Sequence, residues 1–389
     1  MQLDSLALAR LAEAARPLLL GGALRDCHAA PDGQGLVMGV ATVQGPRPMW
    51  FSLSRRFSRW HLIDRLPQRQ EALENHLTMV ARQRLSGAII EDLEVPAGER
   101  ILTLRLLRRD FTGSEERSSL VAELMGPYSN LLVLDSAGVI LATWKVVHSY
   151  ENAYREVRAG KPYVPPPPTG RHPMDTMALE EWRQFFSQQP LEFKVQAALL
   201  QTFKGCTPGV VQAILADLGW EKEAVVADVT EDQIPRWAGA VARVWGAVES
   251  GERLPPWDQW IDPRLEGLAL HRAFAALYTD WERAEREAER AQQWRAALKH
   301  RESELKRLRS KLFEELGEHH RALANRRLGD LIYANLHLLP QQRLGYEVTV
   351  DVPDVFAQAP PPLDLDPSEL SEEELERLTA PEVSPPTVP

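Results

Sequence analysis

Apolar and polar residues follow two different periods in the first 150 residues, which predicts a domain of both helices and strands. Apolar residues recur at helical spacing after Asp4 and stop before Gly21, so we expect a helix over 5–20 that Asp4 caps. A second helix is expected over 69–85. Shorter runs with strand patterns occupy 35–43, 48–53, 88–95, 101–107, 120–125, 131–134 and 139–147. A turn at 135–138 separates the last two runs and predicts a hairpin, so the domain is predicted to be α+β with an antiparallel meander.

Four prolines at 165–168 follow Lys161-Pro162-Tyr163-Val164 and predict a stiff linker that ends this domain. Residues 178–250 then have helical patterns. Their expected core residues are Trp182, Trp220, Trp237 and Trp245. The glycine-containing segment 203–210 lies between two short helices of this region. Such a turn can offer backbone N–H groups to a phosphate or can simply join two helices, and the sequence leaves both roles open.

From about residue 265 to 336 the helical pattern continues almost without interruption. Apolar residues at a spacing of four and three form a stripe from Leu277 to Leu312, although polar residues interrupt it. About 60 residues of helix would make a rod of roughly 90 Å. Its stripe would require a partner helix from this chain or from another. No return helix is predicted, because residues 346–389 are acidic, rich in proline and expected to be disordered.

The formal net charge of −10 comes from one part of the chain. Residues 346–389 hold eleven acidic residues and one basic residue, whereas the first 345 residues hold 44 of each sign. Residues 1–110 carry fifteen arginines, twelve acidic residues and no lysine. Arginine suits phosphate contacts, although a GC-rich genome would give the same usage. The negative total therefore does not exclude a nucleic-acid partner.

Several classes of protein are disfavoured by the sequence. No apolar run is long enough to span a membrane, and the segment Met1-Gln2-Leu3-Asp4 lacks the basic start of a secretory signal. Cys27 and Cys206 stand alone, which is typical of a reducing compartment and provides no cysteine-built zinc site. Phosphate-loop, dinucleotide, zinc-protease and serine-hydrolase motifs are absent. The adjacent His319 and His320 are expected to be solvated. We therefore expect a cytoplasmic protein without a cofactor.

Three segments of the first domain hold candidate functional residues. Asp4 opens the first helix, Glu99 and Arg100 precede the strand at 101–107, and Glu123-Leu124-Met125 end the strand at 120–125. Each segment also has an ordinary role, as a helix cap, a solvated ion pair or a strand that runs into a turn. Glu123 alternates with core residues, so its side chain is expected on the opposite face of the strand.

In their order along the chain, these positions resemble the NFACT family, whose bacterial members are the RqcH and fibronectin-binding A types. The segment Val121-Ala122-Glu123-Leu124-Met125-Gly126-Pro127-Tyr128-Ser129-Asn130-Leu131-Leu132 is similar to the family signature V-E-I-M-G-x-x-S-N-I-I and is the most specific match. Other similar segments are Asp4, Leu20-Gly21-Gly22-Ala23-Leu24, Arg84-Leu85-Ser86-Gly87-Ala88-Ile89-Ile90, Asn152-Ala153-Tyr154-Arg155, Gly160-Lys161-Pro162-Tyr163, Gly329-Asp330-Leu331-Ile332-Tyr333-Ala334-Asn335-Leu336 and Asp364-Leu365-Asp366-Pro367.

The resemblance implies four parts. They are an NFACT-N tRNA-binding domain over 1–170, a helix-hairpin-helix domain over 171–260, the first helix of a coiled coil over 261–345, and the acidic tail over 346–389. By motif match, tRNA binding is assigned to Asp4, Glu99, Arg100, Glu123, Leu124 and Met125. Arginine can contact phosphate or base edges, and carboxylates can accept hydrogen bonds from base amino groups or 2′-hydroxyls.

The resemblance further implies a factor of ribosome-associated quality control. Such a factor binds large ribosomal subunits that still carry peptidyl-tRNA and recruits tRNA, alanyl-tRNA in bacteria, for C-terminal tailing of the nascent chain. Peptidyl transfer belongs to the ribosome, so the protein is not expected to be an enzyme. Neither a membrane nor a metal is expected as a partner.

Departures from the family leave alternatives open. Glu99 replaces an aspartate, and the returning coiled-coil helix and the NFACT-R domain have no counterpart. One alternative is that the chain is a truncated tRNA- or rRNA-binding module without elongation activity. Its partner could then be a separate NFACT-R protein, or a second copy of the chain bound through the long helix. Extracellular adhesion is disfavoured by the lack of a signal sequence. The activity of formamidopyrimidine-type DNA glycosylases, whose fold is similar, is disfavoured by Gln2 in place of a proline nucleophile.

Overall fold

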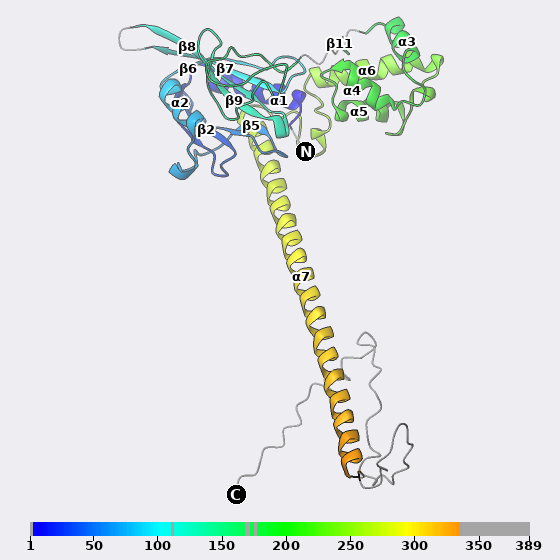
Figure 1. Cartoon of the computed structure of the whole chain (residues 1–389). Coiled ribbons are helices and arrows are strands. Elements are labelled where there is room, and N and C mark those ends of the chain that lie inside the picture. Colours follow the sequence, from blue (N-terminus) through cyan, green and yellow to red (C-terminus); the bar gives the residue numbers. More distant parts are fainter. Residues whose placement is uncertain (1–2, 110–112, 168–171, 175–176, 335, 337–389) are drawn as a thin grey trace. The chain divides into compact units, whose positions relative to one another are not determined.

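The computed structural model describes residues 3–109, 113–167, 172–174, 177–334 and 336 (Figure 1). The predicted disordered tail lies outside the described residues. The chain divides into two compact units, Met1–Ala284 and Glu285–Pro389. The candidate functional residues all belong to the first unit.

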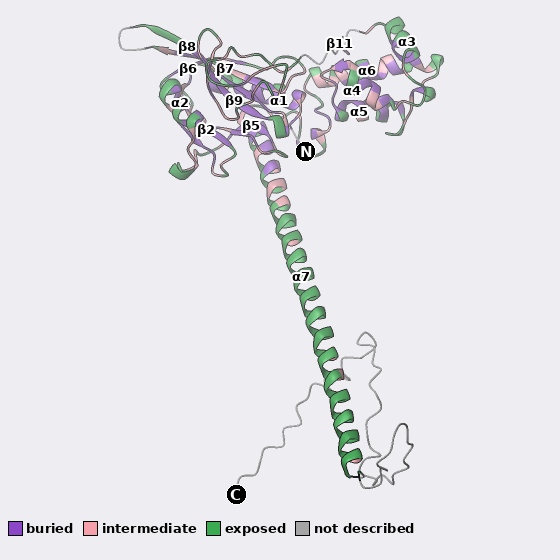
Figure 2. Cartoon of the chain, in the orientation of Figure 1, coloured by how far each residue is buried: buried purple, intermediate pink, exposed green. Residues whose placement is uncertain are grey.

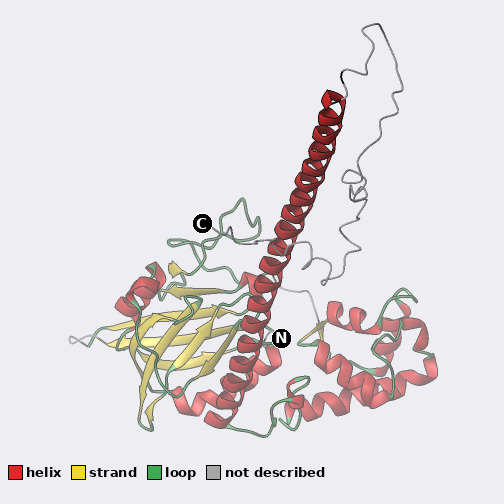
Figure 3. Ribbon diagram, turned by 90° about the horizontal axis from the view of Figure 1, so that it is seen from below, coloured by secondary structure: helices red, strands yellow, loops and turns green. Residues whose placement is uncertain are grey.

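A large antiparallel sheet in the first unit confirms the α+β prediction (Figure 3). Its described strands are β1 (Ala23–Ala29), β2 (Gly35–Thr42), β3 (Gly45–Pro46), β4 (Met49–Ser52), β5 (Arg59–Leu62), β6 (Ile89–Glu94), β7 (Ile101–Arg109), β8 (Glu115–Glu123), β9 (Asn130–Leu134) and β10 (Ile140–Thr143). They are hydrogen-bonded in the order β10-β9-β8-β7-β6-β1-β2-β4-β5, with β3 on β2. β9 and β10 pair antiparallel, which confirms the predicted hairpin.

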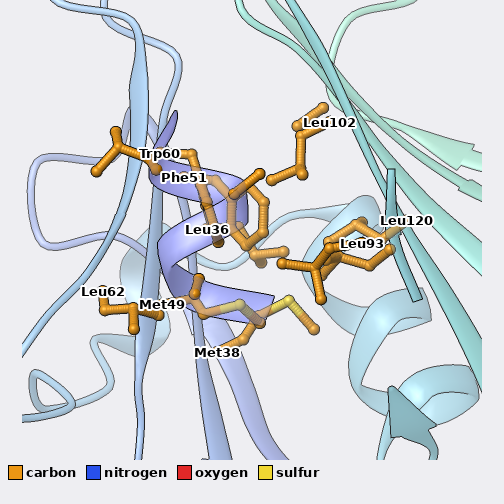
Figure 4. Close-up of a cluster of buried hydrophobic side chains, with 14 of the residues drawn as sticks. Leu36, Met38, Met49, Phe51, Trp60, Leu62, Leu93, Leu102 and Leu120 are labelled. Atoms are coloured by element: carbon orange, nitrogen blue, oxygen red, sulfur yellow. The ribbon is translucent and has the colours of Figure 1, made fainter. Parts of the chain in front are cut away.

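The two halves of this sheet enclose one apolar core. β1 and β6 share a single residue pair, Ala23 with Ile89, so the sheet can bend at this point. Figure 4 shows Phe51 and Trp60 from one half packed towards Leu102 and Leu120 from the other. Burial of these large side chains is the main favourable contribution to folding, at about 1.5–3 kcal/mol for each fully buried one. Packing of Leu102 and Leu120 in this core therefore positions the edge of the sheet at which β7 begins and β8 ends.

Two helices pack on the sheet. α1 (Ser5–Leu19) begins after Asp4 and buries Leu8, Leu11 and Leu19 in the core. α2 (His76–Leu85) begins after Asn75, whose side chain and that of Thr78 form a capping box. The helix expected over 69–85 is therefore wrong in its first part, where only a 3₁₀ turn, η1 (Glu71–Leu73), is present.

Some strand predictions were also wrong. β1 and β5 were not predicted, because the polar residues Arg25, Asp26, Arg59 and His61 hide their alternation. β8 begins at Glu115 and not at 120, since its charged first residues pair across to β7. The run expected over 139–147 forms a strand only over Ile140–Thr143.

The helical prediction for 178–250 is confirmed by four α-helices among the described residues. They are α3 (Leu179–Ser187), α4 (Val195–Thr202), α5 (Pro208–Leu218) and α6 (Ile234–Glu249), with short turns η3 (Val226–Asp228) and η4 (Glu231–Gln233) and a small parallel pair, β11 (His172–Pro173) and β12 (Phe203–Lys204). Trp182 and Trp237 are fully buried in their core, and Trp220 and Trp245 pack against it. The turn after β12 joins α4 to α5, and the Thr207 hydroxyl accepts the Val210 N–H at 3.3 Å as its N-cap.

One long helix, α7 (Gly267–Ala334), follows the turn η5 (Trp257–Gln259). Leu270, Phe274 and Tyr278 are buried in the sheet core, and Trp281 packs against it. Figure 2 shows that exposed residues then dominate, and Leu298 is 67% exposed. The stripe predicted from Leu277 therefore has two parts, because its first members pack on the sheet domain. No helix in the described part of the chain combines the length and the apolarity needed to cross a bilayer.

Candidate functional site

The ends of two neighbouring strands bring the candidate segments together. β7 and β8 pair with Ile101 opposite Glu123. Just beyond this pair, the Leu124 N–H donates to the carbonyl oxygen of Arg100 at 2.8 Å. Asp4 belongs to the same region, because the charge of Arg100 acts on its carboxylate. The three segments that the sequence singled out are therefore neighbours in space.

Asp4 uses both of its carboxylate oxygens within the protein. Oδ1 accepts the Ala7 N–H at 2.9 Å and caps α1, while Oδ2 accepts the Trp257 Nε1–H at 2.9 Å. Burial raises the pKa of Asp4, and the hydrogen bonds from Ala7 and Trp257 and the charge of Arg100 act in the opposite direction. Asp4 thus ties the start of α1 to the segment that leads into α7.

Arg100 is half-buried between two acids. Burial lowers the pKa of its guanidinium, and the charges of Asp4 and Glu99 counteract this effect. Arg100 stays charged at neutral pH, because the ordinary pKa of arginine is far above neutrality. A phosphate that approaches Arg100 would therefore compete with two carboxylates for one partly dehydrated cation.

Glu99 takes part in a contact between the sheet domain and the helical module. One of its carboxylate oxygens lies 3.6 Å from the Nζ of Lys204. The preceding Gly98 has φ +69°, and a Cβ on it would lie 2.6 Å from the Cγ of Lys204 and 2.7 Å from the Gly205 nitrogen. Only glycine fits this approach. The ion pair is partly exposed, and such pairs stabilise by about 1 kcal/mol or less.

Glu123 is enclosed on the other face of β8. Its side chain has no exposed surface, and both carboxylate oxygens accept from the Arg155 guanidinium, at 2.5 and 2.8 Å. The Tyr163 hydroxyl donates to the same carboxylate at 3.0 Å. Burial alone would lower the pKa of Arg155. The hydrogen bonds to Glu123 and its negative charge outweigh burial, so the pKa of Arg155 is raised. Burial, followed by the charge of Glu123, likewise raises the pKa of the Tyr163 hydroxyl.

The rest of the signature after Glu123 fixes a backbone turn. Leu124 is fully buried in the main core. The Met125 N–H donates to the Ser129 hydroxyl at 2.8 Å, and the Gly126 N–H donates to the Ser58 hydroxyl at 3.0 Å. Met125 itself is half-buried. Of the three candidates Glu123, Leu124 and Met125, only Met125 offers side-chain surface to a ligand.

Several arginines of the first domain are already paired with carboxylates, so the domain offers fewer available cations than its composition suggests. On the face of β7 and β8 that points away from the main core, Arg105 pairs with Glu94 at 2.7 Å and Arg117 pairs with Glu91 at 3.3 Å. On the opposite face, beside α2, Arg108 pairs with Glu116. These cross-strand pairs neutralise much of the charge that a phosphate would meet there. Phosphate contacts therefore require the cations that lie away from these ladders.

Three residues that complete the site were not among the sequence candidates. Arg155 and Tyr163 enclose Glu123, and Trp257 donates to Asp4. Arg155 and Tyr163 lie in segments with family resemblance, which was their only signal, and Trp257 had none. In the parts of the chain that the structure describes, no group of three or more His, Cys, Asp or Glu side chains is arranged to hold a metal ion.

Sequence comparison assigns this arrangement to a family. The family model described as NFACT N-terminal and middle domains matches residues 4–374, and the chain belongs to the NFACT family. It is 26% identical over 351 residues to the Rqc2 homolog RqcH of Streptococcus suis, a match that covers 88% of this chain and 60% of that protein. It is 27% identical over 216 residues to the Rqc2 homolog RqcH of Streptococcus pneumoniae, with coverage of 55% and 39%.

A solved structure shares the fold. The fibrinogen binding protein from Staphylococcus aureus superposes with a TM-score of 0.51 and 21% identity, over 65% of this chain and 83% of that one. This likeness concerns the fold alone. The chain spans less than two thirds of the length of the two RqcH relatives.

Proposed function

We propose that this protein acts in ribosome-associated quality control by binding tRNA and the large ribosomal subunit that carries peptidyl-tRNA. The match to the NFACT family over residues 4–374, with relatives named Rqc2 homolog RqcH, is the observation that supports this function. In this role the chain recruits tRNA, alanyl-tRNA by family resemblance, for tailing of the nascent chain in the cytoplasm. The ribosome forms the new bonds, so the protein is a binding factor and not an enzyme.

The chemistry around Arg100 supports a contact with RNA. Its guanidinium lies within electrostatic reach of Asp4 and Glu99 and can present several N–H donors to phosphate oxygens or to a base edge. The Nζ of Lys204 lies 3.6 Å from the Glu99 carboxylate and adds a second cation. A ligand phosphate would have to compete with the carboxylates near these cations. Only a phosphate placed at the right distance and angle would do so, and non-specific attraction of RNA to the surface would not suffice.

Co-purification of tRNA and ribosomal subunits tests this function. The tagged full chain is recovered from cells together with its bound RNA, which is sequenced, and large subunits are measured on sucrose gradients. We expect enrichment of large subunits and of alanine tRNAs. Arg100→Ala is expected to reduce tRNA recovery by about tenfold, because one arginine contact contributes roughly 1–3 kcal/mol.

Arg105→Ala is the matched control, since Arg105 is an exposed arginine of the same domain with a carboxylate partner. It is expected to recover tRNA as the wild type does. Recovery of tRNA without subunits would favour the alternative of an RNA-binding module. Recovery of neither by the wild type would contradict the proposed function.

A further inference from the structure

A short turn after β8 holds an exposed aromatic ring on a fixed backbone. η2 (Gly126–Tyr128) is anchored through the hydroxyls of Ser58 and Ser129, which accept the N–H groups of Gly126 and Met125. Both serines have no exposed surface. The side chain of Tyr128, in contrast, is 81% exposed. The fold thus immobilises the turn without using the ring in its core.

Asn130 places a lysine beside the same turn. The Asn130 Oδ1 accepts the Lys145 N–H at 2.9 Å, and its Nδ2 donates to the Lys145 carbonyl oxygen at 2.8 Å. The Nζ of Lys145 donates to the carbonyl oxygen of Pro127 at 3.2 Å. Because Pro127 directly precedes Tyr128, the ammonium group lies next to the residue that carries the exposed ring.

The ammonium group of Lys145 lies in surroundings that disfavour its charged form. Burial lowers the pKa of Lys145, and the positive charge of Arg55 lowers it further. Within the described residues, no carboxylate forms an ion pair with Lys145. An anion bound beside this ammonium group would favour its charged form and so offset the effect of burial.

We propose that Tyr128 and Lys145 form an RNA-binding platform, in which an unpaired base stacks on the tyrosine ring and the adjacent phosphate binds the lysine ammonium group. This inference rests on the proposed function and names the surface that contacts tRNA. Glu123 and Leu124 are enclosed, so the accessible chemistry of the signature begins at its turn. Aromatic rings beside cations are the usual platform for single-stranded RNA loops.

RNA suits this surface better than a protein partner does. A tyrosine at the centre of a protein interface usually lies among apolar neighbours that exclude water. Here the neighbouring charged group is the Lys145 ammonium, which matches a phosphate beside an unpaired base. The hydrogen bonds of Asn130, Ser58 and Ser129 then have a common purpose, because each one positions part of the platform.

Fluorescence anisotropy of labelled, unfractionated tRNA with the full chain tests the platform. Tyr128→Ala is expected to weaken binding by about tenfold, within the range for loss of one stacked base. Tyr128→Phe keeps the ring and is expected to bind within twofold of the wild type. Lys145→Gln is expected to reduce the slope of log K against log salt concentration by about 1.

Matched controls exist elsewhere in the chain. Tyr333 is also 81% exposed and Lys194 is an exposed lysine, and we expect Tyr333→Ala and Lys194→Gln to leave tRNA binding unchanged. Retention of wild-type affinity by both Tyr128→Ala and Lys145→Gln would overturn the platform alone, and a surface that binds a protein would give this result. Absence of tRNA binding by the wild type would overturn the proposed function and the platform together.

Discussion

The enclosed pair of Glu123 and Arg155 makes the sheet domain sensitive to a single side chain. Removing the guanidinium by Arg155→Ala would leave a buried carboxylate with only Tyr163 as a partner. We expect the free energy of unfolding to fall by about 3–5 kcal/mol, as for other broken buried ion pairs. Urea unfolding monitored by tryptophan fluorescence measures the change.

Arg105→Ala provides the comparison for this prediction. The pair of Arg105 with Glu94 is about half exposed on both sides, so its loss is expected to cost about 1 kcal/mol or less. If the two variants had the same free energy of unfolding, Glu123 would not be held as the structure indicates, and its carboxylate would be available to a ligand.

Local patterns predicted some of the candidate residues and not others. The cap at Asp4 and the buried side of Leu124 follow from helix-start and alternation rules. The enclosure of Glu123 could not be predicted, because its partners Arg155 and Tyr163 lie 32 and 40 residues further along the chain. Alternation indicates which face a side chain occupies, but it carries no information about what covers that face.

At the scale of elements, one buried histidine of α7, His271, bonds to β5, and β5 contains a second buried histidine, His61. His271 of α7 accepts the Leu62 N–H at Nδ1 and contacts the Leu11 carbonyl oxygen through Nε2, each at 3.1 Å. His61 accepts from the Arg59 Nε at Nε2, 3.2 Å away. Each ring uses one nitrogen as an acceptor, so each must be neutral. Burial lowers the pKa of His61 to about 3 and that of His271 to about 4.

These lowered pKa values predict a loss of stability in mild acid. In the unfolded chain both histidines titrate near pH 6.5, so between pH 6.5 and about 4 the unfolded state binds more protons than the folded state. Stability therefore falls as the pH falls through this window. At pH 5 the loss is expected to be about 2 kcal/mol for each histidine.

Urea unfolding at pH 7.5 and pH 5.0 measures this loss. His271→Gln is expected to lower stability at pH 7.5 but to reduce the difference between the two pH values by about half. His300→Gln is the control, because His300 is a surface residue of α7, and it should retain the wild-type difference. An unchanged unfolding midpoint at pH 5.0 in the wild type would contradict the prediction.

The elements themselves differed in how well the sequence predicted them. Strands with clear alternation, such as β7, were found close to their expected positions. β5 was not predicted because it buries two polar residues: Arg59 pairs with Glu282 of α7, and His61 accepts from Arg59. The helical period of α7 was evident, but a period alone does not reveal that Tyr278 packs on a distant sheet.

At the scale of the whole molecule, the distribution of charge matters more than its total. The net charge of −10 is supplied by residues 346–389, and the first 345 residues are balanced. A tethered segment of one sign repels an RNA that approaches any cationic surface of the same chain, and salt screens this repulsion over about 10 Å at 0.1 M. If the chain binds RNA as proposed, we therefore expect the acidic segment to act mainly on the rate of association.

Deleting residues 346–389 is expected to increase the rate constant for tRNA association by several-fold at about 20 mM salt and to have almost no effect at about 300 mM. Stopped-flow anisotropy with labelled tRNA measures both values. A second variant that replaces the eleven acidic residues by their amides keeps the length and should behave like the deletion. Equal rates for all three proteins at low salt would show that the segment does not repel tRNA. If the deletion variant associated faster with tRNA but the amide variant did not, the effect would come from the volume of the segment and not from its charge, because only the deletion removes that volume.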